Sequence, residues 1–348
     1  MKVVILCGGQ GTRFWPASRS SKPKQFLQIN GQKSLLQSTY ERLHPLIEQN
    51  NIFFVCKSQY AEQVIEQIPG ITEEQIILEP SGRNTAASIG LSAYYLQKRF
   101  GNEVMAVLPA DHMIDDRDAF QDALNSAEKI ANNNYLVTFG IKPTRAETGY
   151  GYIEKGEKIK GCSNHEVFQV STFREKPDKK EARNFLNSGK FYWNTGIFVW
   201  KISMILKELK LYQPKLDSVL HRITASQDWN ISKDLFEKLE NVSIDYAVME
   251  KSHRVAMIPA GFKWDDLGDW LSMFKHLAGD ADGNHGNTTM VAVSSQDCLG
   301  YSTSGRTIAL LGIDDLVVVD GDDVLLVCHK DRVQEVKNIL DVIDPKHL

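Results

Sequence analysis

The sequence predicts an α/β protein with a mainly parallel sheet covered by helices on both faces, followed by a small C-terminal β domain. Three features predict this class. Short apolar segments alternate with helical patterns over the first two-thirds of the chain. These segments are continuously apolar, which is typical of strands buried on both faces of a parallel sheet. After Ala278 the chain changes to short strands separated by glycine and aspartate turns, which indicates a separate β unit.

The N-terminal part alternates predicted strands with predicted helices. Its longest helix is rich in alanine, has apolar residues at helical spacing, and starts at Asn84, a residue type suited to cap it. The predicted strands are residues 2–7, 51–56, 75–78, 103–108 and 135–139. The predicted helices are residues 33–43, 59–68, 84–100 and 116–132.

After Gly140 the pattern changes to strands with fewer helices between them. The polar, turn-rich segment 279–286 is the best candidate for a linker. We therefore predict two domains, residues 1–278 and 287–348. The remaining predicted strands are 150–154, 167–173, 191–200, 307–311, 316–319 and 324–327; helices are predicted at 202–211 and 242–251, and an amphipathic helix at 331–342.

Composition and charge exclude several classes of protein. The 348 residues carry a net charge of -4, so neither a nucleic-acid backbone nor an anionic membrane is expected as a main partner. No apolar run approaches the ~20 residues that a membrane helix needs. Five cysteines, at positions 7, 56, 162, 298 and 328, lack the paired spacing of a zinc site or a disulfide framework. We expect a cytoplasmic enzyme.

A glycine-rich loop follows the first predicted strand. Gly8, Gly9 and Gly11 lie within four residues, so backbone N–H groups can turn toward an anion without a side-chain clash. A dinucleotide fingerprint fails because Phe14 stands where its third glycine belongs, and a P-loop fails because Arg13 replaces its second glycine. The loop therefore predicts a phosphate site of another kind, with a plain tight turn as the alternative.

Four cations follow the glycines within twelve residues, although the chain as a whole is acidic. Arginine grips phosphate oxygens with two parallel hydrogen bonds, and lysine supplies a mobile point charge. This composition suits a triphosphate, while a solvated basic turn is the alternative. The four residues are Arg13, Arg19, Lys22 and Lys24.

Three later segments place polar residues where parallel strands end. Residues 79–86 form a strand-to-helix turn that can hold a ligand, or that is an ordinary loop with Asn84 as the cap. Asp111 follows another strand and is placed to bind a metal, or to stabilise a turn. The segment 264–270 holds three carboxylates between two tryptophans; these suit Mg²⁺, although Asp269 equally suits a helix start.

Several polar residues in the middle of the chain suit a sugar phosphate. Glu175 and Lys176 precede a proline, and in extended backbone they point to opposite faces. Gly149 lies beside Tyr150 and allows a flat sugar to approach the backbone, and Asn194 can both donate to and accept from neighbouring hydroxyls. An exposed ion pair, a β-bulge and a strand-edge asparagine are the alternatives.

Together these motifs resemble the sugar-phosphate nucleotidyltransferases, and most of all the mannose-1-phosphate guanylyltransferases. The resemblance rests on Gly-Gly-Gln-Gly-Thr-Arg-Phe-Trp-Pro at residues 8–16, Pro-Lys-Gln-Phe at 23–26, Glu-Pro-Ser-Gly-Arg-Asn-Thr-Ala at 79–86 and Trp-Asp-Asp-Leu-Gly-Asp-Trp at 264–270. It spans about residues 2–275. The family pattern usually has leucine at the positions of Phe14 and Ala17, which are packing changes.

The resemblance implies a fold and a set of site residues. The fold is Rossmann-like, a mixed and mainly parallel sheet with flanking helices, followed by a partial left-handed β-helix. The implied catalytic residues are Arg13, Lys24, Asp111 and Asp266, of which Asp111 and Asp266 bind Mg²⁺. The implied nucleotide-binding residues are Gly8, Gly9, Gly11, Thr12, Arg13, Glu79, Asn84, Thr85 and Asp111, and the implied sugar-phosphate-binding residues are Gly149, Glu175, Lys176 and Asn194.

The implied reaction converts GTP and mannose 1-phosphate into GDP-mannose and pyrophosphate by in-line attack on the α-phosphate. Some relatives add an isomerase domain, and we expect no isomerase activity from this chain. A homodimer through the C-terminal β segment is a further expectation. The alternatives are transfer to a heptose phosphate, a UTP-using relative, a catalytically silent subunit that binds GDP-mannose, and, more distantly, a dehydrogenase.

Overall fold

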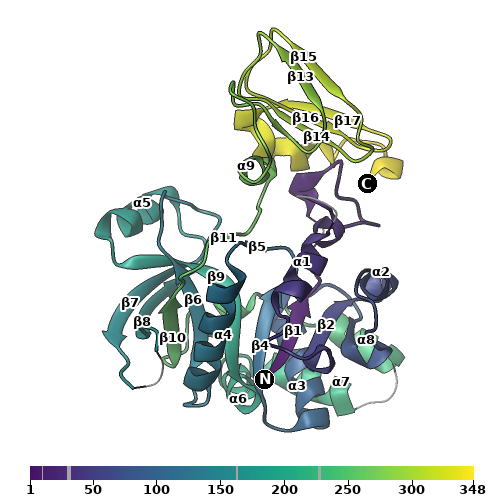
Figure 1. The fold of residues 1–348 in the computed structure, drawn as a ribbon. Coiled ribbons are helices and arrows are strands. Elements are labelled where there is room, and N and C mark those ends of the chain that lie inside the picture. The colour runs from purple at the N-terminus through teal and green to yellow at the C-terminus, as the bar shows by residue number, and fades with distance from the viewer. Residues whose placement is uncertain (10, 30–32, 162–163, 226–228) are drawn as a thin grey trace. The chain divides into compact units, whose positions relative to one another are not determined.

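The computed structural model describes residues 1–9, 11–29, 33–161, 164–225 and 229–348 (Figure 1). Packing divides the chain into two units. The first consists of Met1–Gly8, Arg42–Pro109 and Ile114–Trp264; the second consists of Gly9–Glu41, Ala110–Met113 and Asp265–Leu348. The predicted domain limits, 1–278 and 287–348, stay a prediction.

A nine-stranded sheet forms the centre of the first unit, in the order β3-β2-β1-β4-β9-β6-β10-β8-β7. Strands β8 and β9 run against the others, so the sheet is mixed and mainly parallel, as predicted. The strands are β1 (Lys2–Leu6), β2 (Ile52–Lys57), β3 (Ile76–Glu79), β4 (Val104–Pro109), β6 (Leu136–Ile141), β7 (Tyr152–Lys158), β8 (Phe168–Arg174), β9 (Phe191–Lys201) and β10 (Val255–Pro259).

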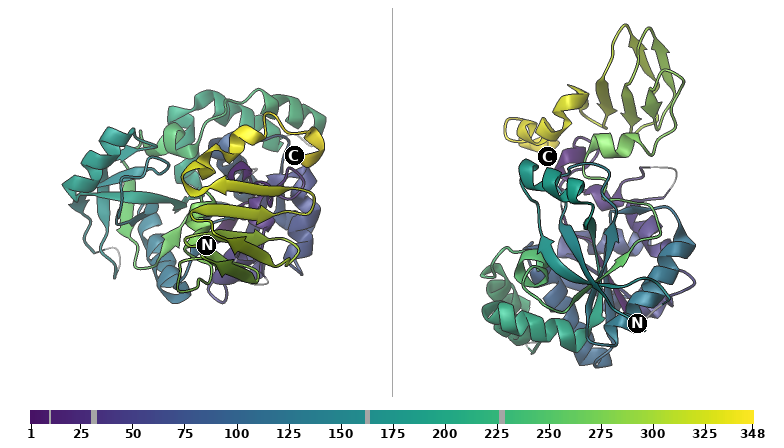
Figure 2. Two further views of the ribbon diagram at one scale, coloured as in Figure 1. Left: turned by 90° about the horizontal axis from the view of Figure 1, so that it is seen from above. Right: turned by 90° about the vertical axis from the view of Figure 1, so that its left-hand side faces the viewer.

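Helices lie on both sides of this sheet (Figure 2). One face buries Val4, Met105 and Val107 together with apolar residues of α3, α6 and α7, while Phe120 of α4 packs edge-on against Phe262. Burial on both faces explains why the strands are continuously apolar. The helices of this unit are α2 (Ala61–Gln67), α3 (Asn84–Phe100), α4 (Arg117–Ala131), α5 (Lys179–Ser188), α6 (Ile202–Tyr212), α7 (Pro214–Ala225) and α8 (Trp229–Glu237).

The carboxyl ends of the parallel strands gather the segments that carry the motifs. Leu6 at the end of β1 pairs with Pro109 at the end of β4, and Lys57 at the end of β2 pairs with Glu79 at the end of β3. Asn194, near the start of the antiparallel β9, pairs with Gly140 toward the end of β6. Loops that leave this edge are the usual ligand-binding loops of an open α/β sheet.

The C-terminal strands form two small sheets whose successive parallel strands stack like the turns of a β-helix (Figure 2, left). Side chains from both sheets, among them Ile308, Leu310 and Val318, share one apolar cluster. This confirms a β-helix-like segment, while its left-handed sense stays a prediction. The strands are β12 (His285–Gly286), β14 (Leu299–Ser302), β16 (Leu316–Asp320) and β17 (Leu325–His329) in one sheet, and β13 (Met290–Val293) and β15 (Ile308–Leu311) in the other.

Three predicted elements take a different form. The segment 279–286 is an ordered turn, because Asp280 accepts hydrogen bonds from the amides of Asp282 and Asn284, and the segment's role as a linker stays a prediction. Within 242–251, residues Asp245–Met249 form a π-helix, η6. The C-terminal helix is the 3₁₀-helix η7 (Lys330–Ile339), since its buried Val333 and Val336 are three residues apart and suit three residues per turn.

The remaining elements are short. Strands β5 (Met113–Ile114) and β11 (Trp264–Asp265) pair with each other. No helix among the described residues combines the length and the hydropathy required to cross a membrane. The other helices are α1 (Leu35–Arg42), α9 (Trp270–Phe274) and the 3₁₀-helices η1 (Thr12–Phe14), η2 (Lys24–Phe26), η3 (Gln49–Asn51), η4 (Ser58–Tyr60), η5 (Glu73–Gln75) and η8 (Pro345–His347).

Candidate active site

Lys24 joins two aspartates that lie far apart in the sequence. Its Nζ donates to Asp111 Oδ2 at 2.8 Å and to the main-chain oxygen of Asp266 at 2.7 Å. Both acceptors, Asp111 Oδ2 and the main-chain oxygen of Asp266, therefore lie within hydrogen-bond distance of one nitrogen atom. The Lys24 side chain is buried and forms an ion pair with Asp111. The structure thus brings together three of the four predicted catalytic residues.

Electrostatics keep Asp111 ionised. Burial raises the pKa of its carboxyl, but the charges of Lys24 and His112 outweigh burial and hold that pKa below its ordinary value. His112 Nε2 lies 3.9 Å from Asp111 Oδ1. A buried lysine beside an ionised carboxylate is an arrangement that can bind a phosphate and a metal ion at one point.

The donors at this point fit a divalent cation. Asp111 offers a carboxylate oxygen here, and Asp266, whose main-chain oxygen bonds Lys24, carries a second carboxylate; such oxygens are hard ligands suited to Mg²⁺ or Mn²⁺. Among the described residues, no group of three or more His, Cys, Asp or Glu side chains could hold a metal ion. A site with only two carboxylates suits a cation that also binds substrate phosphates.

The glycine loop packs directly against Lys24. Gly11 has a φ of +62°, in the left-handed region, and a Cβ placed on it would overlap the Cβ of Lys24. Its carbonyl oxygen accepts a hydrogen bond from Ser18 Oγ at 2.6 Å. Gly11 is therefore required both for its backbone conformation and for the room that Lys24 occupies.

We predict that Gly11→Ala destabilises the fold by about 1–3 kcal/mol, from left-handed strain and the overlap with Lys24. Urea unfolding at equilibrium measures the change. Gly8→Ala is the matched control, because Gly8 has no positive φ and its Cβ would meet nothing within 4 Å. Equal stability of the two variants would contradict the packing described here.

The remaining loop residues present an open surface. Gly8, Gly9, Thr12 and Arg13 are exposed, and Gly9 has a φ of +96°. Phe14, where the family pattern has leucine, is buried with its ring 5.1 Å from that of Trp270. One buried residue thus anchors the loop while its neighbours stay accessible to a ligand.

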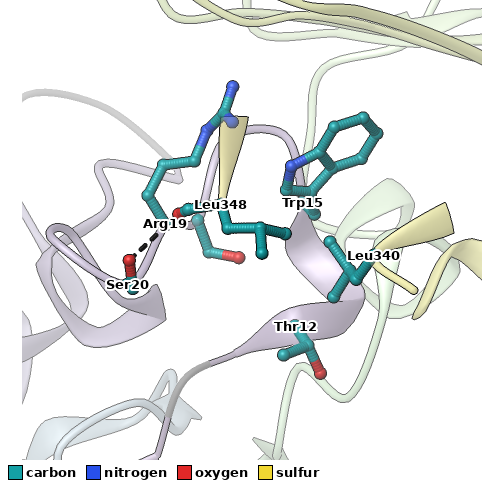
Figure 3. A pocket seen from close by; sticks show the side chains of 7 residues that line it. Thr12, Trp15, Arg19, Ser20, Leu340 and Leu348 are labelled. Carbon is teal, nitrogen blue, oxygen red and sulfur yellow. Dashed lines mark hydrogen bonds between the residues drawn. The ribbon is translucent and has the colours of Figure 1, made fainter. Parts of the chain in front are cut away.

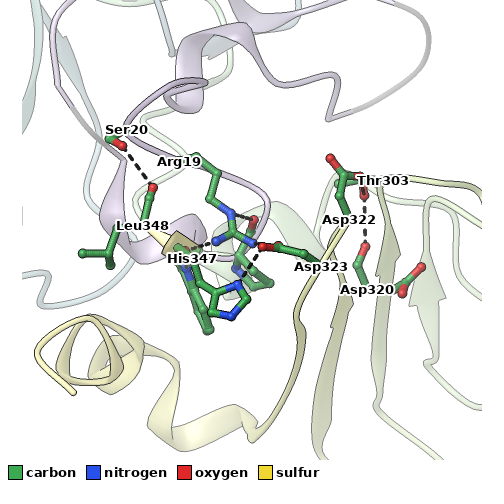
Figure 4. Close-up of polar contacts among 10 residues, drawn as sticks. Arg19, Ser20, Thr303, Asp320, Asp322, Asp323, His347 and Leu348 are labelled. Atoms are coloured by element: carbon green, nitrogen blue, oxygen red, sulfur yellow. Dashed lines mark hydrogen bonds and ion pairs between the residues drawn. The ribbon is translucent and has the colours of Figure 1, made fainter. Parts of the chain in front are cut away.

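Arg19 departs from the prediction for the basic turn. Its guanidinium donates to Asp323 Oδ1 at 2.5 Å and to the main-chain oxygen of His347, and His347 Nδ1 lies 2.7 Å from Asp323 Oδ2 (Figure 4). Trp15 Nε1 also donates to the His347 oxygen, at 2.9 Å. Arg19 therefore ties the loop to the C-terminal residues and is not a free phosphate ligand.

A cavity of about 320 Å³ lies beside this contact (Figure 3). It does not include Lys24 or Asp111. Because mostly apolar atoms line it, it does not suit a phosphate group. Its lining residues are Thr12, Trp15, Ser18, Arg19, Ser20, Leu340 and Leu348.

The turn between β3 and α3 holds three predicted nucleotide-binding residues. Asn84 has a φ of +64° and is the first residue of α3, and its Oδ1 accepts from the N–H of Thr85 at 2.9 Å. This differs from the predicted cap, whose side chain would bond an N–H two or three residues on. Thr85 Oγ1 accepts from the N–H of Ile244 at 2.8 Å, so its hydroxyl has a structural role.

Glu79 is buried beneath this turn and accepts a hydrogen bond from Ser88 Oγ. Burial raises the pKa of its carboxyl to about 7, although the bond from Ser88 and the charge of Lys57 oppose the shift. The side chain therefore titrates near neutral pH. It is exposed on neither face of the turn, so the predicted contact with a nucleotide stays a prediction.

The raised pKa of Glu79 predicts that the fold loses stability as pH rises. The unfolded chain releases this proton near pH 4.5, whereas the folded protein keeps it to about pH 7. Between these values the native state binds more protons, so the free energy of unfolding falls by on the order of 3 kcal/mol as pH increases. Glu79→Gln should remove this pH-dependent loss of stability. The variant should then be more stable than the parent chain at pH 8 but not at pH 4. Chemical denaturation across this range measures it, and parallel curves would contradict the prediction.

The predicted sugar-phosphate residues include a compact polar cluster. Lys176 Nζ lies 3.4 Å from Glu175 Oε1, and a Cβ on Gly151 would overlap Glu175 Oε2. Asn194 Oδ1 accepts from Thr138 Oγ1 at 2.8 Å. Gly149 is exposed, and its N–H donates to Glu147 Oε1 at 3.0 Å.

Two acidic residues of this cluster were missed by the sequence reasoning. Asp245 Oδ1 accepts from Asn194 Nδ2 at 3.0 Å, and Glu250 Oε1 accepts from the N–H of Glu175 at 2.8 Å. Burial raises the pKa of Glu175 to about 7 and that of Asp245 to about 6. No spacing singles out these two residues, because Asp245 begins the π-helix and Glu250 directly follows it, inside a segment whose sequence has the pattern of an ordinary helix.

Comparison with known families covers nearly the whole chain. The family model described as "Nucleotidyl transferase" matches residues 2–283. A second model, "MannoseP isomerase/GMP-like beta-helix domain", matches residues 288–343. The first match contains every predicted site residue, and the second coincides with the stacked C-terminal strands.

Individual relatives agree with these models. The chain is 39% identical over 350 residues to the mannose-1-phosphate guanylyltransferase of Escherichia coli, covering 98% of this chain and 75% of that protein. It is 38% identical over 354 residues to the alginate biosynthesis protein AlgA of Pseudomonas aeruginosa, covering 98% and 72%. A crystal structure described as mannose-1-phosphate geranyltransferase, from Thermus thermophilus, superposes with a TM-score of 0.88 at 32% identity, covering 98% of each chain. The chain therefore belongs to the nucleotidyl transferase family of enzymes and has its mixed α/β fold with a C-terminal β-helix-like segment.

Proposed function

We propose that this chain transfers a guanylyl group from GTP to mannose 1-phosphate and releases pyrophosphate, with GDP-mannose as the product. The observation that carries the proposal is the Lys24 side chain bonded to both Asp111 and Asp266. That geometry concentrates cationic and metal-binding groups at one point. The name of the Escherichia coli relative supports the choice of GTP and mannose 1-phosphate.

The proposed phosphate site combines the glycine loop with Lys24. Backbone N–H groups of Gly8, Gly9, Gly11 and Thr12, with the exposed Arg13, hold the β- and γ-phosphates. Lys24 offsets negative charge around the α-phosphate in the transition state. The loop tolerates close approach because Gly8, Gly9 and Thr12 are exposed.

The proposed metal ion is Mg²⁺, held by the carboxylates of Asp111 and Asp266. It supplies positive charge that offsets the repulsion between the two phosphate groups. Lys24 meanwhile keeps Asp111 ionised and ready to bind the cation.

The proposed sugar site is the cluster of Glu175, Lys176 and Asn194 beside Gly149. Lys176 is exposed and binds the sugar phosphate, while Glu175 and Asn194 bind sugar hydroxyls. Thr138 and Asp245 each bond one end of the Asn194 amide, so its orientation is fixed before the sugar arrives. Glu79, Asn84 and Thr85 form the proposed guanine-binding turn.

The proposed chemistry is a single displacement. An oxygen of mannose 1-phosphate forms a bond to the α-phosphorus of GTP as the bond from that phosphorus to the bridging β-oxygen breaks, and pyrophosphate leaves with the electron pair. No proton has to be removed, because the nucleophile is already an anion. The work of the protein is to position the two substrates and to neutralise charge.

The experiment is a measurement of pyrophosphate release from a grid of nucleoside triphosphates and sugar 1-phosphates, with and without Mg²⁺. We expect the highest kcat/KM for GTP with mannose 1-phosphate, and no turnover without the metal ion. A preference for UTP or for a heptose phosphate would overturn the substrate assignment. Tight binding of GDP-mannose without turnover would indicate a regulatory subunit. The cytoplasmic location and the homodimer stay predictions.

A further inference from the structure

Leu267 has a backbone conformation that needs support. Its φ is +48°, which a residue with a bulky side chain rarely adopts, and its side chain is completely buried in the cluster that contains Trp270 and Met273. A left-handed residue of this kind costs about 1–2 kcal/mol and persists only where its surroundings hold it. Leu267 directly follows Asp266, so whatever holds Leu267 also sets the direction of Asp266.

Asp265 supplies that support. Its Oδ1 accepts a hydrogen bond from the N–H of Leu267 at 2.8 Å, which closes a tight turn around Asp266. Its Oδ2 lies 3.4 Å from His276 Nε2, and only 16% of the side chain is exposed. The carboxylate of Asp265 is thus held from two sides and turned back toward its own backbone, away from the role of a ligand.

The turn sets the positions of both the main-chain oxygen and the carboxylate of Asp266. The main-chain oxygen accepts from Lys24 Nζ at 2.7 Å. A Cβ on Gly268 would lie 3.3 and 3.4 Å from the two carboxylate oxygens of Asp266. The Asp266 carboxylate therefore packs against Gly268, which has no side chain to crowd it. Leu267 anchors the turn in the core between these two neighbours.

We propose that Asp265 is a positioning residue for the active site. By bonding the N–H of Leu267 it holds the turn that orients Asp266 toward Lys24 and the metal ion. The side chain acts as a hydrogen-bond acceptor, so a neutral residue with an oxygen in reach can replace it. This inference rests on the proposed function for its kinetic consequence, but its structural part is independent of the reaction.

Three variants test the proposal. Asp265→Ala removes the acceptor, while Asp265→Asn and Asp265→Ser keep one. We expect the alanine variant to lose about 10- to 100-fold in kcat with a smaller change in KM for either substrate, and to bind Mn²⁺ about 10-fold more weakly. Amide hydrogen exchange at Leu267 should be faster in the alanine variant. Asparagine should restore most of each property.

The matched control is Asp280→Ala, which removes a carboxylate that accepts from two backbone amides in a turn without contact to Lys24. It should leave kcat and Mn²⁺ binding unchanged. The proposal is overturned if Asp265→Ala retains the Mn²⁺ affinity and the Leu267 exchange rate of the parent chain, or if asparagine is as harmful as alanine. Absence of guanylyl transfer by the parent chain would instead reject the proposed function, while the exchange and Mn²⁺ comparisons would still decide the role of Asp265.

Discussion

Replacing Lys24 with alanine should lower kcat by about 10²–10³-fold, equivalent to about 3–4 kcal/mol of transition-state stabilisation. The reason is that Lys24 Nζ is the donor shared by Asp111 and Asp266 at the proposed α-phosphate position. The Lys24 side chain is buried, so a water molecule in its place would not supply the positive charge that bonds Asp111 and Asp266. Steady-state kinetics at saturating GTP, mannose 1-phosphate and Mg²⁺ would measure the effect.

Lys33→Ala is the matched control for charge. Lys33 is exposed and pairs with Glu41, so its removal should leave kcat within a factor of about two. If Lys24→Ala turned over at the rate of Lys33→Ala, Lys24 would have no part in the chemical step. The account of the phosphate site would then be wrong.

A second large effect is expected for Asp111→Asn. The change keeps the shape of the side chain but removes the negative charge that faces Lys24 and the proposed metal ion. Loss of metal-assisted charge stabilisation is worth several kcal/mol, so kcat should fall by about 10³-fold or more, and the Mg²⁺ concentration for half-maximal activity should rise. Titration of activity with Mg²⁺ measures both quantities.

Asp118→Asn serves as the control, because Asp118 is exposed on α4 and no predicted role falls on it. It should have the Mg²⁺ response of the parent chain. An Asp111→Asn variant with full activity at ordinary Mg²⁺ would show that this carboxylate does not bind the metal ion.

The sequence predicts the parallel part of the fold well, for a physical reason. Strands such as β1 are buried on both faces, so their residues must be continuously apolar, and the limits of α3 follow from its alanine-rich periodicity. Strand β10 could not be predicted from the sequence, since its five residues follow a helical pattern with no turn residues between the two. The π-helix at Asp245–Met249 could not be predicted either, because over so short a length its apolar spacing is the same as that of an α-helix.

For the site, motif residues were easier to predict than their partners. Lys24 contacts the carboxylate of Asp111 and the main-chain oxygen of Asp266, all three of which belong to motifs, while the meeting of the two carboxylates stays a prediction. Arg19 was expected beside phosphates, but the partner that pairs with it, Asp323, is 304 residues away along the chain. Asp245 and Asp265 act through contacts with Asn194 and Leu267, and such contacts are defined only by the folded backbone.

The central claim is that one metal ion binds between Asp111 and Asp266 beside Lys24. Crystals grown with Mn²⁺ and GDP-mannose test it most directly, because manganese is located by its anomalous scattering. The account predicts a manganese peak bonded to the carboxylates of both aspartates and to a phosphate oxygen. Manganese bound to the nucleotide with neither carboxylate as a ligand, or bound elsewhere on the protein, would contradict it.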